Sequence, residues 1–108
     1  NHIIPTAITY QNTLLTNVTA LKNILPDYES VADVQIEAIR TISYHIREIQ
    51  TMVSDMTEAR KQANAIADEV ARAEEYTEKV RPYLEKIRYH VDKLIWPLPK
   101  YRELLFSR

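Results

Sequence analysis

The sequence predicts an all-α protein in which three long helices form an up-down bundle. Glycine is absent from the 108 residues, where average usage would supply about seven. Good helix-forming residues are abundant instead, which indicates the fold class. Apolar residues recur at helical spacing in three successive stretches, which indicates the bundle. We expect a single domain over residues 1–108, with helices at about 4–25, 30–63 and 68–95.

The first predicted helix, residues 4–25, has a clear apolar stripe and a polar face that is poor in charge. Thr and Asn fill much of that polar face, and both have mediocre helix propensity. Pro5 suits a first turn, because the N–H groups there lack intrahelical partners anyway. We expect this helix to depend on packing more than on intrinsic propensity. The stripe consists of Ile4, Ala7, Ile8, Leu14, Leu15, Val18, Leu21, Ile24 and Leu25.

The second predicted helix, residues 30–63, follows a break in the periodicity at Pro26. Ser30 is the expected N-cap, and Asp33 places an acidic group in the first turn. The apolar positions of this helix are spaced 3, 4, 3, 4 and 3 residues apart, which is typical of a bundle or coiled-coil seam. They are Ile39, Ile42, Ile46, Ile49, Val53 and Met56, and the same register continues to Arg60 and Ala63.

The apolar stripe shifts by one residue between Ala63 and Ile66. A continuous, locally overwound helix fits this shift, and so does a tight hairpin near Asn64. We favour the hairpin, with Asn64 in the left-handed region and Asp68 capping the third helix. A continuous rod of about 65 residues would need a partner to bury both of its halves. The predicted seam of the third helix is Ile66, Val70, Ala73, Thr77, Val80, Leu84, Ile87, Val91 and Leu94.

Prolines punctuate the last third of the chain. Pro82 falls inside the third helix and should kink it, because its ring collides with the carbonyl of Glu78. Pro97 and Pro99 should end that helix and start an extended connector. A short helical turn is expected beyond them, so the chain would finish in a proline-rich hook.

The sequence predicts no catalytic, cofactor-binding or metal-ligating residue. Without glycine the chain cannot form a glycine-rich phosphate loop, and without cysteine it has no thiolate ligand or nucleophile. No Glu-x-x-His or His-Glu-x-x-His pattern occurs, so bundle metal sites are not indicated. His45 and His90 are expected at the flanks of the bundle, forming hydrogen bonds between helices.

Charge indicates protein partners rather than other classes of ligand. The 14 basic and 15 acidic side chains are intermixed, so we expect neither nucleic acid nor a membrane surface as partner. No apolar run approaches the ~20 residues of a membrane span. The apolar C-terminal end either closes the core of this domain or docks on a larger protein. The candidate docking surface is Trp96, Leu98, Tyr101, Leu104, Leu105 and Phe106.

The C-terminal third resembles one known family. Its residues 79–83 (Lys-Val-Arg-Pro-Tyr), 87–94 (Ile-Arg-Tyr-His-Val-Asp-Lys-Leu) and 96–106 (Trp-Pro-Leu-Pro-Lys-Tyr-Arg-Glu-Leu-Leu-Phe) are similar to the C-terminal end of the type III glutamine synthetases. The start of the chain, residues 3–12 (Ile-Ile-Pro-Thr-Ala-Ile-Thr-Tyr-Gln-Asn), and residues 58–64 fit the same region. In one departure, Leu94-Ile95-Trp96 joins two segments that in the family are separated by roughly two more helical turns.

The resemblance implies a non-catalytic C-terminal domain that serves structure or assembly. The parent enzyme of that family ligates ammonia to glutamate with ATP and Mg²⁺ in a large cytoplasmic homo-oligomer. Its catalytic region lies upstream, so no catalytic residue transfers to this chain. The implied partners are that catalytic region and neighbouring subunits. The alternative is a stand-alone helical adaptor or coiled-coil module for protein-protein interaction.

Overall fold

The computed structural model describes residues 3–95, and every element in that range is helical. This confirms the all-α prediction for that part of the chain. The elements are α1 (Ile3–Ile24), α2 (Tyr28–Val31), α3 (Asp33–Asn64), α4 (Glu69–Glu75), the π-helical turn η1 (Tyr76–Val80) and α5 (Arg81–Ile95). The bounds lie within a few residues of the predicted ones. The predicted C-terminal hook lies outside the described residues.

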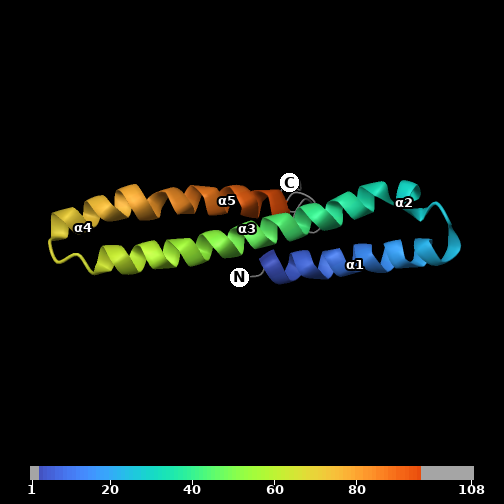
Figure 1. Ribbon diagram of the computed structural model, residues 1–108, viewed down its shortest axis with the longest axis horizontal. Coiled ribbons are helices and arrows are strands. Elements are labelled where there is room, and N and C mark those ends of the chain that lie inside the picture. Colours follow the sequence, from blue (N-terminus) through green and yellow to red (C-terminus); the bar gives the residue numbers. More distant parts are fainter. Residues whose placement is uncertain (1–2, 96–108) are drawn as a thin grey trace, which may run out of the picture.

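The molecule is a narrow rod of 65 × 35 × 18 Å, and α3 forms its spine. Helix α1 lies antiparallel to the first half of α3. After α3 the chain reverses, and α4, η1 and α5 lie antiparallel to its second half (Figure 1). A three-helix bundle along the whole length is therefore not confirmed. The two connections lie at opposite ends of α3. Helix α1 and the α4–η1–α5 segment, called the returning arm below, are each shorter than α3. The three long helices consequently overlap only near the middle of the rod.

Side-chain amides tie α1 to the first half of α3. Gln11 Nε2 donates to the carbonyl oxygen of Ile39 (3.0 Å) and to Ser43 Oγ (2.7 Å). Gln35 Nε2 donates to Asn17 Oδ1 (3.0 Å). These bonds add direction to the apolar contact, because an amide must meet its acceptor at a fixed geometry.

The connection between α1 and α3 differs in detail from the prediction. Ser30 was expected to cap the second helix, but it lies inside the single turn of α2. Ala32 holds the N-cap position of α3 and makes no side-chain cap bond, while Asp33 does lie in the first turn. After Pro26, the chain first forms the short helix α2. The long helix α3 therefore begins at Asp33, three residues later than the predicted start at residue 30.

The predicted hairpin near Asn64 is confirmed, and the continuous-helix alternative is wrong. Helix α3 ends at Asn64, and Asp68 caps α4 by accepting a hydrogen bond from the Ala71 N–H at 2.9 Å. The expected left-handed Asn64 is not observed, since no described residue has a positive φ. Tyr76 Oη instead donates to Asn64 Oδ1 (2.6 Å), and Arg72 Nη1 donates to the Ile66 carbonyl (3.0 Å). Side chains from the returning arm thus hold the turn closed.

A π-helical turn precedes Pro82, where a kink was predicted. The Arg81 N–H bonds to the carbonyl of Tyr76, five residues back, instead of to that of Thr77. In a regular α-helix the ring of Pro82 would collide with the carbonyl of Glu78. A π turn holds one extra residue and thereby redirects the carbonyls that the proline would meet. The backbone accommodates Pro82 by inserting this turn, and the helical path continues into α5 (Figure 1).

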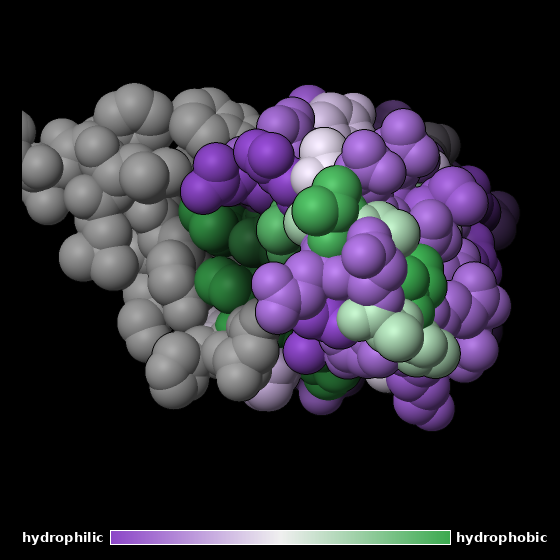
Figure 2. All heavy atoms as spheres, turned by 90° about the vertical axis from the view of Figure 1, so that its left-hand side faces the viewer, coloured by the Kyte–Doolittle hydropathy of each residue, from purple (hydrophilic) through white to green (hydrophobic). Residues whose placement is uncertain are grey.

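The extra residue also changes which side chains face α3. Upstream of η1, the predicted seam positions Ala73 and Thr77 are exposed, and their predecessors Arg72 and Tyr76 are partly buried. This displacement by one residue is what a single π turn produces. Val70 and Leu84, also predicted in the seam, are 67% and 55% exposed. Figure 2 views the rod from the end where α3 stops and α4 begins. This end is mostly hydrophilic, and hydrophobic residues show between the hydrophilic ones.

The remaining predicted seam positions are mixed. On the returning arm Val80 and Leu94 are buried, and Ile87 and Val91 are partly buried, as predicted. On α3 the seam prediction fails at Val53, which is 42% exposed. Helix α1 lies along the first half of α3 and α5 along the second half (Figure 1), so a single 3–4 repeat does not describe the buried positions of the whole helix.

We predict that Asp68→Ala lowers the free energy of unfolding by about 1 kcal/mol, because it leaves a backbone N–H of α4 without its acceptor. The matched control is Asp27→Ala. Asp27 holds the N-cap position of α2 but makes no cap bond, so its loss should cost less than about 0.5 kcal/mol. Urea unfolding followed by circular dichroism measures both changes. Equal losses for the two variants would contradict the assigned cap.

Candidate functional site: the helix junction

The best-buried part of the described structure is the junction where the start of α1, the middle of α3 and the end of α5 meet. Ala7, Ile42 and Leu94 are 0–1% exposed there, and Ile49 packs with them. Partly buried residues from all three helices surround this cluster: Ile3, Ile4, Tyr10, Leu14, Ile46, Ile87 and Val91. The small side chain of Ala7 lets α1 approach closely, so that two large aliphatic groups can fill the space between the helices.

We predict that Leu94→Ala destabilises the fold by about 2–5 kcal/mol, because it removes a fully buried side chain and leaves a cavity between three helices. The same change at the exposed Leu84 should cost less than about 1 kcal/mol. Denaturant midpoints and slopes for the two variants, measured side by side, test this prediction. The junction would not be the main core if Leu84→Ala were as costly as Leu94→Ala.

Two buried histidines form the polar centre of the junction. His45 on α3 and His90 on α5 are 8% and 6% exposed, and their Nδ1 atoms lie 2.8 Å apart. At that distance one Nδ1 carries a proton and donates it to the lone pair of the other. The predicted hydrogen bonding between helices is confirmed, but the two residues are buried rather than at the flanks. Sequence reasoning missed that each is the partner of the other, since 45 residues separate them and no local spacing signals the pair.

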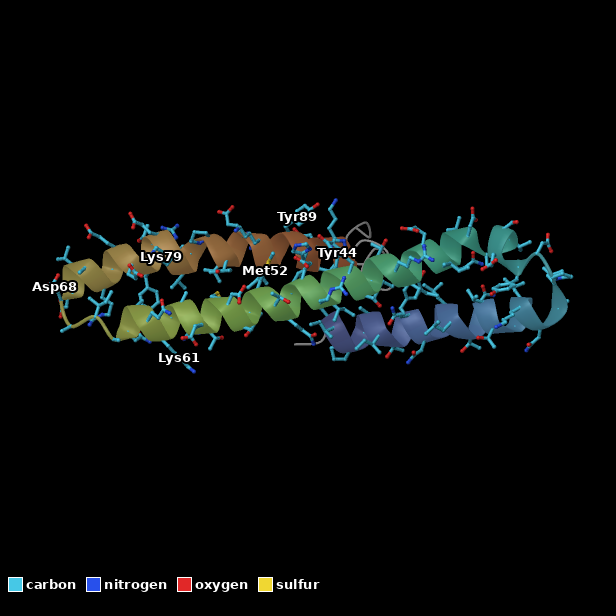
Figure 3. The ribbon with its side chains drawn as sticks, viewed as in Figure 1. Tyr44, Met52, Lys61, Asp68, Lys79 and Tyr89 are labelled. Atoms are coloured by element: carbon cyan, nitrogen blue, oxygen red, sulfur yellow. The ribbon has the colours of Figure 1, made fainter. Side chains whose placement is uncertain are left out.

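Aromatic rings enclose the histidine pair. Tyr44 meets the ring of His45 edge-on with centroids 5.0 Å apart, and Tyr89 meets that of His90 in the same way at 5.1 Å. Figure 3 shows Tyr44 and Tyr89 near each other in the middle of the rod. Lys93 Nζ lies over the ring of Tyr89, 5.3 Å from its centroid, and forms a cation–π contact with it.

These surroundings favour neutral imidazole at His45. Burial lowers the pKa of His45 below its ordinary value of 6.5, and the positive charges of His90 and Lys93 lower it further. Glu48 on α3 acts in the opposite direction. From α1 no charged side chain reaches this point, because the first charged residue of the chain is Lys22. A neutral His45 can take part in the Nδ1–Nδ1 hydrogen bond as donor or as acceptor, whereas protonation of both rings would leave neither Nδ1 with a lone pair to accept it.

We predict that the fold loses stability as the pH falls below about 6.5. Because the pKa of folded His45 is lowered, the unfolded chain binds more protons in this range. The contribution of His45 is therefore complete above its ordinary pKa and is lost as the pH decreases toward its lower pKa in the folded protein. Urea midpoints at about pH 7.5 and about pH 5.5 measure the effect, since carboxylates titrate mainly below this range.

Two variants control that measurement. His45→Asn keeps a hydrogen-bonding group close to the position of Nδ1 but cannot titrate, so the difference between the two pH values should shrink. His2→Asn removes a histidine outside the described residues and should leave the difference unchanged. An undiminished pH dependence in His45→Asn would contradict the assignment to His45.

Other chemistry-bearing side chains do not converge in the described range. Within residues 3–95, no three side chains of the His, Asp or Glu type are grouped so that they could hold a metal ion. No helix in this part of the chain is long and apolar enough to cross a membrane. The candidate docking residues Trp96, Leu98, Tyr101, Leu104, Leu105 and Phe106 lie outside the described residues, so their role stays a prediction.

Comparison with known proteins supports one assignment. No protein-family model matches the chain. The chain is 48% identical over 117 residues to a protein named glutamine synthetase from Bacteroides fragilis (strain YCH46). The match covers the whole of this chain but 16% of that protein, in its C-terminal region. The predicted resemblance to the C-terminal end of a glutamine synthetase is thus confirmed.

Proposed function

We propose that this chain is the non-catalytic C-terminal domain of a type III glutamine synthetase, and that it serves the structure and assembly of the enzyme. The observation that carries this proposal is the 48% identity to a glutamine synthetase over the full length of the chain. The rod form supports it, because a narrow helical rod presents much surface for its mass and encloses a small core.

The placement of the titratable groups supports a structural role. His45 and His90 are engaged with each other inside the junction. Each of two acid-base pairs joins residues one helical turn apart: Glu37 with Arg40 (4.0 Å), both exposed, and the exposed Lys79 with the partly buried Glu75 (3.6 Å). Such pairs solvate a helix and contribute little free energy. Catalysis by paired carboxylates depends instead on a cleft that separates their pKa values.

In this proposal the chemistry belongs to the preceding part of the enzyme. That part would bind ATP, Mg²⁺ and glutamate and ligate ammonia, in a cytoplasmic homo-oligomer. The partners of the present domain are the catalytic region of the same protein and neighbouring subunits. The aromatic C-terminal residues, among them Trp96 and Phe106, dock on those partners, since aromatic anchors supply most of the free energy at many interfaces.

The test is the double substitution Trp96→Ala with Phe106→Ala in the full-length enzyme. Truncating two aromatic anchors of the proposed interface should raise the subunit dissociation constant at least about a hundredfold. Sedimentation velocity over a dilution series measures the oligomer size, and activity is followed in parallel. Val70→Ala with Leu84→Ala, two exposed apolar positions on the returning arm, is the control. Unchanged oligomer size and activity in the Trp96/Phe106 variant would contradict the assembly role.

A further inference from the structure

The outer face of α1 differs from the other exposed surfaces of the rod in carrying no charged side chain before Lys22, in the last turn of the helix. The first 21 residues of the chain contain no Asp, Glu, Lys or Arg, and Lys22 is the first charged residue. Ile8 and Leu15, seven residues apart, are nevertheless 41% and 44% exposed on this helix. A shallow hollow beside Leu15 is lined by Asn12, Leu15, Thr16, Thr19, Ala20 and Asn23.

Threonine hydroxyls on this face already have acceptors within the helix. Thr9 Oγ1 donates to the Pro5 carbonyl (3.0 Å), Thr13 Oγ1 to the Thr9 carbonyl (3.2 Å) and Thr16 Oγ1 to the Asn12 carbonyl (3.0 Å). A hydroxyl whose proton is bound inside its own helix has little more to lose when water is removed from the surface. Covering these three hydroxyls therefore carries a small desolvation cost.

Exposed apolar residues on the returning arm have different neighbours. Arg81, Glu85 and Lys86 line the same hollow as Leu84. Val70 shares its hollow with Glu69, Glu74 and Glu78. Charges around an exposed apolar residue are typical of a solvated helix face, whereas depletion of charge is typical of the centre of an interface. Exposed apolar residues thus occur on both arms of the rod, but charged side chains surround them only on the returning arm.

We propose that the outer face of α1, centred on Leu15, docks on an uncharged and apolar surface of the synthetase region that precedes this chain. This inference rests on the proposed function and names the face that makes the contact. The matched stretch is 16% of the glutamine synthetase it resembles and is C-terminal there, so most of such a chain precedes α1. An uncharged face is complementary to an uncharged partner, because a charge buried against it would lack a counterion.

The size of the face favours this occupant over a second copy of the chain. A helix of 22 residues is about 33 Å long and about 10 Å wide, so one face covers about 330 Å². Stable interfaces between separate chains bury about 800 Å² per partner. A region linked covalently to α1 needs less area, because its effective concentration is high.

The experiment compares Leu15→Lys with Leu84→Lys in the full-length enzyme. Both positions hold a leucine that is about half exposed in this domain, so the same change adds the same charge to either arm. Hydrogen-deuterium exchange of the α1 amides is followed by mass spectrometry. Leu15→Lys should speed exchange in α1 at least about tenfold over the wild type, and Leu84→Lys should leave it unchanged. Both variants of the 108-residue chain should keep the wild-type helicity.

Three results would overturn the inference. The first is equal α1 exchange in the wild-type enzyme and in the 108-residue chain. The second is equal behaviour of the Leu15→Lys and Leu84→Lys enzymes. The third is a dimer of the 108-residue chain that Leu15→Lys dissociates, which would identify a second copy as the occupant. If the Trp96/Phe106 variant dissociates the enzyme while Leu15→Lys has no effect, the assembly role stands and the assignment of the α1 face fails.

Discussion

The rod depends on the packing of Leu94 and Ile42 against Ala7, at the one point in the described structure where three long helices meet. A pair of antiparallel helices buries only one stripe of each, which stabilises an isolated hairpin weakly. Here two such pairs share α3, and the junction joins them into one cooperative unit. The histidine pair lies inside this contact. It gives the junction a defined register, because the 2.8 Å bond between the two Nδ1 atoms forms at only one alignment of α5 on α3.

The returning arm shows how a local backbone constraint is absorbed without loss of packing. Pro82 cannot donate to the helix ladder, and the π turn from Tyr76 to Val80 removes the clash at the cost of one inserted residue. The insertion brings Tyr76 onto the side of α3, where its hydroxyl bonds to Asn64. A single irregularity therefore accommodates the proline and also supplies a side chain that holds the hairpin turn.

The two arms present different surfaces to their surroundings. The returning arm carries closely spaced charges of both signs, as a solvated helix does. Helix α1 presents threonine, asparagine and exposed aliphatic groups, and its first charged side chain is Lys22 in the last turn. This asymmetry is the observation behind the proposal that the α1 face, and not the α4–η1–α5 arm, makes the contact with the preceding region.

Much of this architecture follows from the residues alone. The absence of glycine, the helical spacing of apolar residues and the shift between Ala63 and Ile66 predicted an all-α chain with a hairpin near Asn64. The C-terminal residues also predicted the glutamine synthetase resemblance, which the comparison confirmed. The protein-binding role that composition and charge indicate stays a prediction. The helices and the hairpin turn are local features, so propensity, capping and spacing are sufficient to predict them.

Tertiary structure decided the rest. Where α1 and α5 lie along α3 depends on the lengths of the arms and the positions of the two turns, and this produced a rod in place of a full bundle. The one-residue displacement at Ala73 and Thr77 arose because the backbone accommodated Pro82 with a π turn, which apolar spacing does not reveal. The pairing of His45 with His90 required two helix faces to meet, and a contact across 45 residues has no local signature in the sequence.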